Sequence, residues 1–235
     1  MQTDLARKRL ADIMAQLANT HRAHLEKLKQ ARDQYERDDF IWHFLLQSFA
    51  TMGRSTGWQG LIGTPENYDR LAFGELAKAE PNARKSLVAG ICRDARVRMP
   101  NRKACYICSA HAMIESMGGP AQASAQLRAQ PGRAGKIQFL MQFRGIGPKY
   151  ARNIMMDVYH EEFRESIAID SRIQSITDAL GLSFGTYEEQ EAFYLSVAHA
   201  SQLNGWEMDR LLYGYTDAVL KELAAQPKTS SPGCA

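Results

Sequence analysis

The chain has 235 residues, of which 45% are hydrophobic and 23% charged, and its formal net charge is +3. These proportions are those of a globular protein with a sizeable core, so extensive disorder is excluded. No apolar run approaches the roughly 18 residues that a membrane helix requires, and the N-terminal sequence lacks the apolar stretch of a signal peptide. We therefore expect a cytoplasmic protein without a membrane partner.

Helical periodicity runs through nearly the whole chain. Sequence rich in Ala, Leu, Lys and Glu predicts one long amphipathic helix, or two consecutive ones, over residues 1–37. The next helix is expected to begin after Asp38 and Asp39, which are candidate caps, and to end near Gly53, where a glycine-rich loop follows. Further helices are expected over 68–78, 81–98, 103–117, 121–129, 136–143, 149–159, 170–180, 187–204 and 206–225. Because no long stretch alternates apolar and polar residues as a strand would, the predicted fold class is all-α.

The charges are unevenly ordered along the chain. Residues 116–156 contain no Asp or Glu, whereas residues 157–191 contain nine acids and two arginines. Such an asymmetry is an electrostatic footprint that the net charge hides, and it is compatible with a nucleic-acid partner. Two solvated helical faces of opposite sign would give the same pattern.

The most informative segment contains Gly145-Ile146-Gly147-Pro148, which we call the glycine turn, between two apolar helical stretches. Its two glycines allow a tight reversal and leave backbone N–H groups uncovered. These groups precede a new helix, whose N-terminus favours an anion such as a DNA phosphate, and Pro148 suits its first position. Arg144 and Arg152 would add contacts to the DNA backbone. An ordinary helical corner, with glycines for close packing, is the alternative.

Lys149 begins the helix after the turn, and Ile167-Ala168-Ile169-Asp170 follows downstream. This combination resembles the helix-hairpin-helix-GPD superfamily of DNA base-excision glycosylases, specifically over 136–173 and diffusely over 40–220. In that family a lysine at the position of Lys149 marks bifunctional enzymes, and an aspartate at the position of Asp170 is essential. The family's Gly-Pro/Val-Asp is here Ile-Ala-Ile-Asp. The resemblance implies a helix-hairpin-helix motif and a DNA-binding cleft between two helical subdomains.

The chemistry of such enzymes accounts for both residue types. Cleavage of an N-glycosidic bond generates positive charge on the sugar, which a fixed carboxylate such as Asp170 stabilises. An unprotonated amine such as Lys149 attacks C1′ and forms a Schiff base, which permits β-elimination of the 3′ phosphate. Taken singly, Lys149 could instead contact a phosphate, and Asp170 could be a helix cap.

A target base has to leave the stack and enter a pocket. Trp206, Asp209 and Tyr213 share one helical stripe, which resembles the closing helix of archaeal-type 8-oxoguanine DNA glycosylases. In those enzymes an acid and an aromatic residue four positions later contact the damaged base. A buried aromatic stripe with a surface acid is the alternative.

A second candidate region for the base lies at the end of the helix expected after residue 39. In the superfamily this helix end enters the duplex, so Gln47 or Phe49 is a candidate for filling the space of the flipped base, and Trp58 for stacking on it. The spacing of Phe49 also fits an apolar core face.

The cysteines argue against a cofactor. Near the C-terminus there is only Cys234, so the iron–sulfur loop of endonuclease III-type members cannot form. Cys105 and Cys108 form a CxxC pair without the second pair that structural zinc requires. We expect no metal held by side chains. Whether backbone carbonyls of the glycine turn bind a monovalent cation is not decided by the sequence.

The sequence therefore predicts a bifunctional DNA glycosylase and AP lyase that acts on oxidised guanine in double-stranded DNA, as a monomer associated with the nucleoid. The alternatives are a monofunctional glycosylase for another lesion and a non-catalytic DNA-binding module. The expected parts are an N-terminal helical extension (1–37), a glycosylase domain (38–225) with its hairpin at 136–159, and a flexible tail (226–235).

Overall fold

The computed structural model describes residues 2–53 and 56–225. Within these residues the regular elements are helices and no strand occurs, so the predicted all-α class is confirmed. The chain divides into two compact units. We call the described residues of 1–32 and 155–225 the terminal unit and those of 33–154 the central unit, and describe each by itself.

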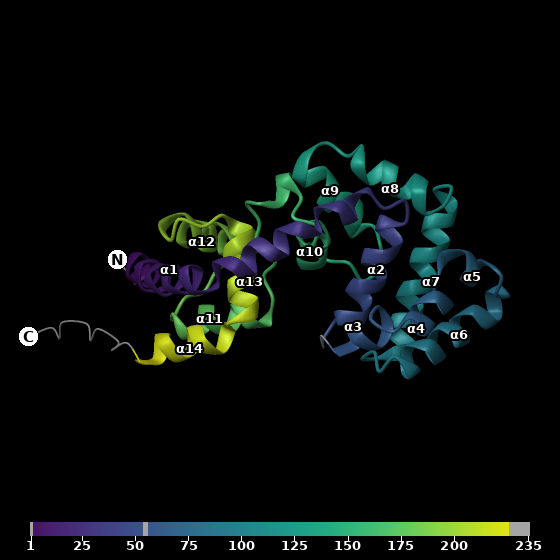
Figure 1. The fold of residues 1–235 in the computed structure, drawn as a ribbon, viewed down its shortest axis with the longest axis horizontal. Helices are drawn as coiled ribbons and strands as arrows, with labels where there is room; N and C mark the ends of the chain where they lie inside the picture. Colours follow the sequence, from purple (N-terminus) through teal and green to yellow (C-terminus); the bar gives the residue numbers. More distant parts are fainter. Residues whose placement is uncertain (1, 54–55, 226–235) are drawn as a thin grey trace, which may run out of the picture. The chain divides into compact units, whose positions relative to one another are not determined.

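The terminal unit joins the N-terminal helix to the C-terminal third of the chain. Its helices are α1 (Gln2–Leu28), the short 3₁₀ helix η2 (Glu161–Phe163), α11 (Ser171–Ala179), α12 (Tyr187–Ala200), α13 (Gly205–Gly214) and α14 (Thr216–Ala225). Helix α1 packs against α12, α13 and α14, as Figure 1 shows. A second 3₁₀ helix, η1 (Lys29–Glu36), carries the chain from this unit into the central unit.

The apolar stripe of α1 is the reason that it belongs to the terminal unit. Leu10, Ile13 and Met14 are buried there, and the hydroxyl of Ser201 on the opposing side donates to the Ala11 carbonyl at 3.1 Å. Helix α1 changes direction at His21, whose backbone angles are not helical. The separate extension expected over 1–37 is therefore divided between the units, and the described residues up to Arg32 belong to the terminal unit.

Capping boxes fix where two helices of the terminal unit begin. The Thr186 side chain accepts from the Glu189 N–H while Glu189 reaches back to the Thr186 N–H, and Asn204 and Glu207 do the same at α13. Such reciprocal pairs satisfy N–H groups that the first helical turn leaves without partners. They set the register of α12 and α13, which carry several candidate functional side chains.

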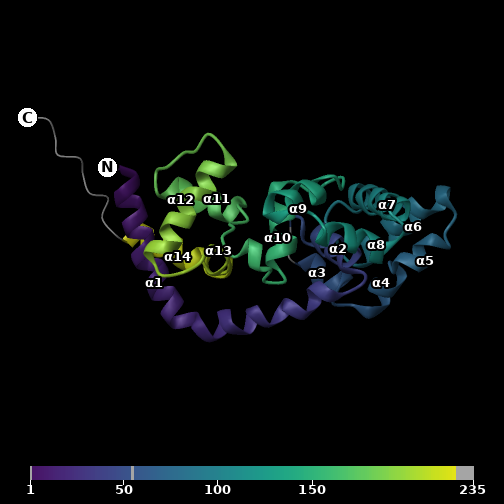
Figure 2. The same ribbon diagram turned by 90° about the horizontal axis from the view of Figure 1, so that it is seen from above.

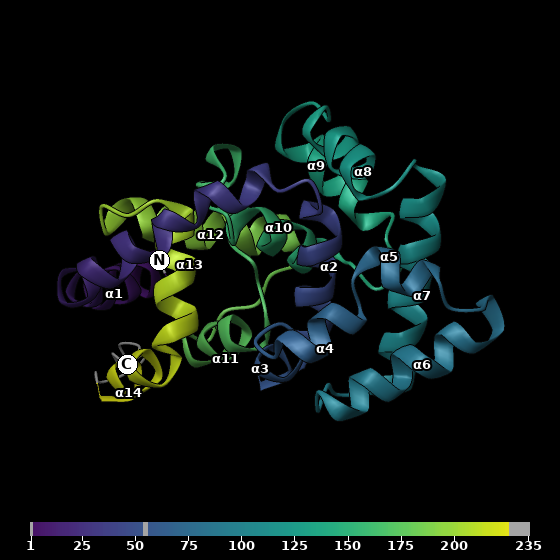
Figure 3. The same cartoon turned by 45° about the vertical axis from the view of Figure 1, so that its right-hand side comes forward.

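The central unit is a bundle around α2. Its helices are α2 (Phe40–Thr51), α3 (Thr56–Leu61), α4 (Pro65–Arg70), α5 (Phe73–Ala77), α6 (Pro81–Asp94), α7 (Pro100–Ser116), α8 (Pro120–Arg128) and α9 (Gly132–Met141), and α10 (Pro148–Met156) begins in it. Helix α2 is buried on most sides because it packs against α3, α7 and α8. Helices α6 and α7 lie side by side (Figure 2), and α8 and α9 do so in Figure 3.

The glycine-rich stretch after α2 contains a helix that the sequence did not predict. Helix α3 occupies part of the expected loop, and Gly57 and Gly60 bring it against neighbouring backbone. A Cβ at Gly57 would collide with the Ala50 carbonyl, and one at Gly60 with the Ala95 carbonyl. The glycines therefore serve close helix packing at these positions.

The other differences concern how expected helices are divided and capped. The helix expected over 68–78 corresponds to the end of α4 and to α5, with a break at 71–72. The helix expected over 206–225 is two helices, because the backbone leaves helical geometry at Tyr215. Asp39 occupies the cap position of α2, but its side chain makes no cap hydrogen bond and is held by Arg37 instead. The tail expected over 226–235 lies outside the described residues.

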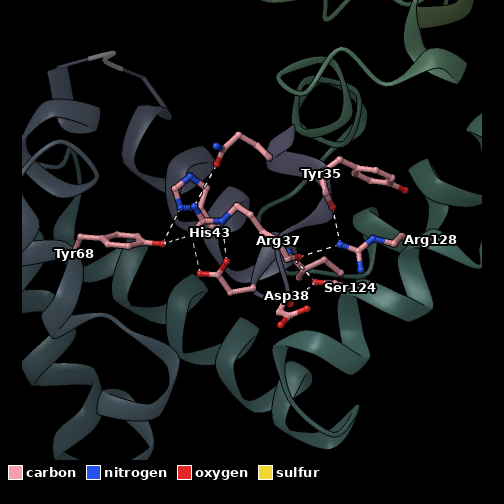
Figure 4. Close-up of polar contacts among 10 residues, drawn as sticks. Tyr35, Arg37, Asp38, His43, Tyr68, Ser124 and Arg128 are labelled. Atoms are coloured by element: carbon pink, nitrogen blue, oxygen red, sulfur yellow. Dashed lines mark hydrogen bonds and ion pairs between the residues drawn. The ribbon is translucent and has the colours of Figure 1, made fainter. Parts of the chain in front are cut away.

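A polar cluster fastens the chain entering the central unit to α2 and α8 (Figure 4). The Arg128 guanidinium donates to the carbonyls of Tyr35 and Arg37 at 2.6 and 2.9 Å. Arg37 binds both oxygens of Asp39. His43 Nδ1 lies 2.7 Å from the Tyr68 hydroxyl, and Figure 4 shows the two side chains pointing toward each other. The two bonds from Arg128 thus give hydrogen-bond partners to backbone carbonyls just before α2.

His43 should make stability depend on pH. Burial, and then the charge of Arg37, lowers its pKa to about 4 from 6.5. The folded state disfavours the protonated ring, so the contribution of His43 to the free energy of unfolding is fully present above pH 6.5. It is lost as the pH falls toward 4, by up to about 3 kcal/mol. Urea unfolding of wild type and His43→Gln across this range should show a shallower pH dependence for the variant. Replacement of the exposed His24 by Gln should leave the wild-type dependence intact.

Candidate functional site

The glycine turn is a tight reversal between α9 and α10. The Ile146 N–H donates to the Phe143 carbonyl at 2.9 Å. Gly145 has a φ of +93°, and a Cβ there would lie 2.7 Å from the Tyr106 ring. The turn therefore needs glycine at 145 both for backbone conformation and for packing. At Gly147 nothing lies within 4 Å of an added Cβ, so this second glycine faces open space.

Tyr106, on α7, is the support beneath the turn. Its hydroxyl accepts from the Arg102 Nε at 2.6 Å, and its ring also packs against Phe49 from α2. The ammonium of Lys103 lies 5.6 Å from the centre of the same ring. Burial, and then the neighbouring Arg102, lowers the pKa of Lys103 to about 8. The glycine turn thus rests on an aromatic ring with two cations beside it.

The basic residues expected around the turn differ in accessibility. Lys149 is half-buried at the start of α10, and its Nζ lies 4.2 Å from the centre of the Tyr150 ring. Arg144 is exposed. Arg152 is buried, and its guanidinium donates to the Pro148 carbonyl at 3.3 Å. In this structure Arg152 therefore supports the first turn of α10 rather than facing solvent, which corrects its expected role in DNA contact.

Gln47 and Trp58 are brought together by α2 and α3. The Trp58 Nε1 donates to the Gln47 Oε1 at 3.1 Å, while 42% of Trp58 is exposed. A hydrogen bond thus orients an exposed indole ring. Phe49 is fully buried, so it is a core residue and the interpretation of it as a wedge is corrected. Its ring is held inside the unit by the contact with Tyr106.

Asp170 lies in the terminal unit, at the N-cap of α11. Its Oδ1 accepts from the backbone N–H groups of Arg172 and Ile173 at 2.9 and 3.2 Å. The capping interpretation is therefore confirmed. A carboxylate at a helix N-terminus lies where the helix dipole favours negative charge, so the fold holds an anion at this position.

Arg172 and Tyr213 form a stacked pair close to the beginning of α11. The Arg172 guanidinium lies 4.1 Å from the centre of the Tyr213 ring, which is 46% exposed. Its hydrogen bond to Tyr213 raises the pKa of Arg172 further, against the effect of burial. An exposed aromatic ring covered on one face by a guanidinium is suited to stacking on a flat ligand.

The backbone leading to Asp170 is buried and irregular, and side chains pair its N–H groups. Ile167 N donates to Glu191 Oε1 at 3.0 Å, and Ala168 N donates to Asp209 Oδ1 at 2.7 Å. The Tyr187 hydroxyl accepts from the third N–H, that of Ile169, at 3.0 Å and donates to the Ile167 carbonyl at 2.7 Å. We call Tyr187, Glu191 and Asp209 the backbone clamp.

Two residues of the expected base pocket have interior partners. Trp206 is 2% exposed, and its Nε1 donates to the Met156 carbonyl at the end of α10. Asp209 is 3% exposed and belongs to the backbone clamp. Both side chains are therefore inside the unit, and their contact with a base stays a prediction. Of that stripe, Tyr213 is the residue that faces solvent.

The two candidate catalytic residues belong to different units of the fold. Lys149 lies in the central unit and Asp170 in the terminal unit, so each is placed by its own unit. In the described part of the chain, no three His, Cys, Asp or Glu side chains are grouped as they would be around a metal ion. Within the same residues, every helix is too short or too polar to span a bilayer.

Tyr187 and Glu191 were not among the candidate residues predicted from the sequence. A signal was available, because Tyr187, Glu191, Tyr194 and Ala198 recur at helical spacing on one stripe of α12. A glutamate within an otherwise apolar stripe is uncommon, since an acid is rarely buried without a partner. The partner is the backbone of a segment that ends at Asp170.

Comparison with known proteins gives a fold and no sequence family. No protein-family profile matches the chain, and no curated protein matches its sequence. Among solved structures, the 8-oxoguanine DNA glycosylase of Thermotoga maritima matches 88% of this chain and 96% of its own, with a TM-score of 0.64 and 14% identity. The chain has the fold of this enzyme. The resemblance expected from the sequence is thereby confirmed for the fold.

A second solved structure agrees with the first. The 8-oxoguanine DNA glycosylase of Methanocaldococcus jannaschii matches 88% of this chain and 92% of its own, with a TM-score of 0.62 and 15% identity. The likeness covers both units, because it extends over most of the chain.

Proposed function

We propose that this protein is a DNA glycosylase with AP-lyase activity that removes oxidised guanine from double-stranded DNA. The observation that carries the proposal is the fold shared with two 8-oxoguanine DNA glycosylases over 88% of the chain. Two features of the chain support it: Lys149 directly follows the glycine turn, and the fold holds the Asp170 carboxylate at the start of α11.

The proposed reaction uses Lys149 as nucleophile. Its neutral amine attacks C1′, the N-glycosidic bond breaks, and the base leaves with the bonding electrons and takes up a proton. Asp170 stabilises the positive charge that develops on the sugar. Ring opening gives the Schiff base, and loss of a C2′ proton expels the 3′ phosphate. Water then hydrolyses the imine and releases Lys149.

The remaining residues supply binding. The glycine N–H groups of the turn and the exposed Arg144 contact the DNA backbone, in keeping with the open space beside Gly147. The hydrogen-bonded Gln47 and Trp58 pair is the candidate for stacking beside the flipped base, and Tyr213 for contact with the base itself. A monovalent cation on the carbonyls of the turn would fit the same backbone role.

Borohydride trapping tests the proposal. Wild-type protein is incubated with duplexes that contain 8-oxoguanine, an oxidised pyrimidine, uracil or an abasic site, and reduction converts a Schiff base into a stable adduct. We expect adducts with the 8-oxoguanine and abasic duplexes. Base release without any adduct would identify a monofunctional glycosylase. DNA binding with neither release nor adduct would identify a non-catalytic DNA-binding module.

The glycine turn allows a matched test of DNA binding. Gly147→Ala adds a methyl group in open space, so we predict an unchanged melting temperature but DNA affinity reduced on the order of tenfold, because a phosphate can no longer approach the N–H groups. Gly145→Ala should instead cost roughly 2–4 kcal/mol of stability, from its positive φ and its contact with Tyr106. Calorimetry and fluorescence anisotropy measure the two effects. Equal affinity of Gly147→Ala and wild type would contradict the phosphate contact.

A further inference from the structure

We propose that the backbone clamp, Tyr187, Glu191 and Asp209, positions the catalytic carboxylate of Asp170. The proposal rests on the proposed function and adds three residues that act through the backbone rather than on the substrate. Their side chains pair the N–H groups of three consecutive residues, Ile167–Ile169, and the next residue in the chain is Asp170.

The segment 166–169 needs such partners because of its surroundings. Ser166 and Ile167 are fully buried and Ala168 is 4% exposed, yet the segment has no neighbouring strand. A buried N–H without a partner is costly, so the acceptors have to come from side chains. The clamp supplies one acceptor for each of the three N–H groups.

Two of the three acceptors are buried carboxylates, those of Glu191 and Asp209. Glu191 and Asp209 are each 3% exposed, and burying a carboxylate is more expensive than burying a neutral acceptor. Charge-assisted hydrogen bonds are shorter and stronger than neutral ones, and the bond from Ala168 N to Asp209 is 2.7 Å long. The two carboxylates therefore restrain the N–H groups of Ile167 and Ala168 more strongly than neutral acceptors would.

The clamp also joins helices that are themselves fixed. Tyr187 and Glu191 come from α12, and Asp209 comes from α13; both helices begin with capping boxes. At Gly205, the first residue of α13, an added Cβ would lie 2.8 Å from the Ser166 N, so this helix also touches the segment directly. The position of Asp170 is thereby tied to two helices besides its own.

A catalytic carboxylate benefits from such fixing because electrostatic stabilisation depends on geometry. A displacement of about 1 Å at a reacting centre can reduce the rate on the order of 10²-fold. The capping bonds orient the Asp170 side chain, while the clamp locates the backbone that carries it. Loss of one clamp bond should therefore slow base release without weakening DNA binding.

Tyr187→Phe is the sharpest test, because it removes a single hydroxyl and with it two hydrogen bonds to the segment. Tyr194→Phe is the matched control. Tyr194 lies on the same helix and also donates to a backbone carbonyl, that of Ile173, but it makes no bond to residues 167–169. Both variants lose a phenol hydroxyl that is bonded inside the terminal unit.

Three measurements separate positioning from general stability. We expect Tyr187→Phe to slow single-turnover release of 8-oxoguanine by 10- to 100-fold, to keep wild-type affinity for the same duplex, and to keep Schiff-base trapping on a preformed abasic site, where no base has to be expelled. Hydrogen exchange of the amides at 167–169 should be at least about tenfold faster than in wild type. Tyr194→Phe should match wild type in release rate and in exchange at these amides.

Asp209 provides a second variant with a conservative rescue. Asp209→Ala should slow base release as Tyr187→Phe does, whereas Asp209→Asn keeps an acceptor for the Ala168 N–H and should restore part of the rate, because the neutral amide forms a weaker bond. If Asp209 contacted the base instead, both variants would lose the preference for binding the 8-oxoguanine duplex over an undamaged one. That outcome would overturn its place in the clamp.

The outcomes distinguish this inference from the proposed function. Wild-type protein that releases no 8-oxoguanine would refute the proposed function, while hydrogen exchange would still test whether the clamp immobilises residues 167–169. Equal rates for Tyr187→Phe and wild type, or equal losses for Tyr187→Phe and Tyr194→Phe, would overturn the positioning role.

Discussion

Replacement of Lys149 by arginine should abolish borohydride trapping while leaving DNA affinity close to that of wild type. The guanidinium keeps the positive charge that a phosphate contact needs, but it cannot form a Schiff base. Loss of a covalent nucleophile costs on the order of 10³-fold or more in rate. Gel analysis measures the trapped adducts, fluorescence anisotropy measures the affinity for an 8-oxoguanine duplex, and single-turnover base release on the same duplex measures the rate.

Lys149→Gln completes this test because it removes the charge as well. We expect it to abolish trapping and also to weaken DNA binding, whereas Lys85→Gln, the same change at an exposed position on α6, should retain trapping. Base release that persists in both Lys149 variants would assign Lys149 to phosphate contact and the protein to the monofunctional class. The pair of variants thus separates the two roles that the sequence left open.

The features that the sequence predicted are local ones. The helices follow from periodicity, and Asp170 caps α11 as its sequence position suggests. The glycine turn was recognisable because both of its glycines lie within four residues, directly before a proline that starts a helix. In each case, the interaction that fixes the structure lies within a few residues of the pattern that reveals it.

What the sequence could not predict depends on distant contacts. The packing that requires glycine at 145, in addition to its positive φ, comes from Tyr106 on a separate helix. The bonds of the backbone clamp join residues 18, 24 and 41 positions apart. Phe49 and Trp58 are aromatic residues of the same region, yet one is fully buried and the other 42% exposed. Periodicity does not reveal such pairings, because they are set by tertiary packing.

These contacts change the interpretation of the C-terminal stripe. From the sequence, Trp206, Asp209 and Tyr213 form one surface for a base. In the structure Trp206 holds the end of α10, Asp209 holds the backbone before Asp170, and Tyr213 remains exposed with Arg172 on its ring. On this single stripe, two side chains are buried and support the backbone, and the third is exposed. The burial of the side chains shows this difference, whereas their spacing in the sequence does not.

Asp170→Asn should separate the chemical role of Asp170 from its structural role. Asparagine is as good a helix cap as aspartate, so the two bonds from Arg172 and Ile173 should persist and stability should change by only a few tenths of a kcal/mol. The negative charge is lost, however, and removal of one preorganised electrostatic group typically costs 10²- to 10³-fold in rate. We therefore expect a folded protein whose single-turnover release of 8-oxoguanine is slower by roughly that factor.

Two companion variants make this prediction decisive. Asp170→Ser also keeps the cap without the carboxylate and should be as slow as Asp170→Asn, whereas Asp170→Ala should lose about a further 1 kcal/mol of stability because the cap is gone. Thermal unfolding and base release measured on all three variants resolve the two contributions. If release followed stability, with Asp170→Asn active and only Asp170→Ala impaired, Asp170 would be a helix cap alone. If instead all three are equally slow while only one is destabilised, the carboxylate acts on the developing charge of the sugar, and the cap serves to hold it there.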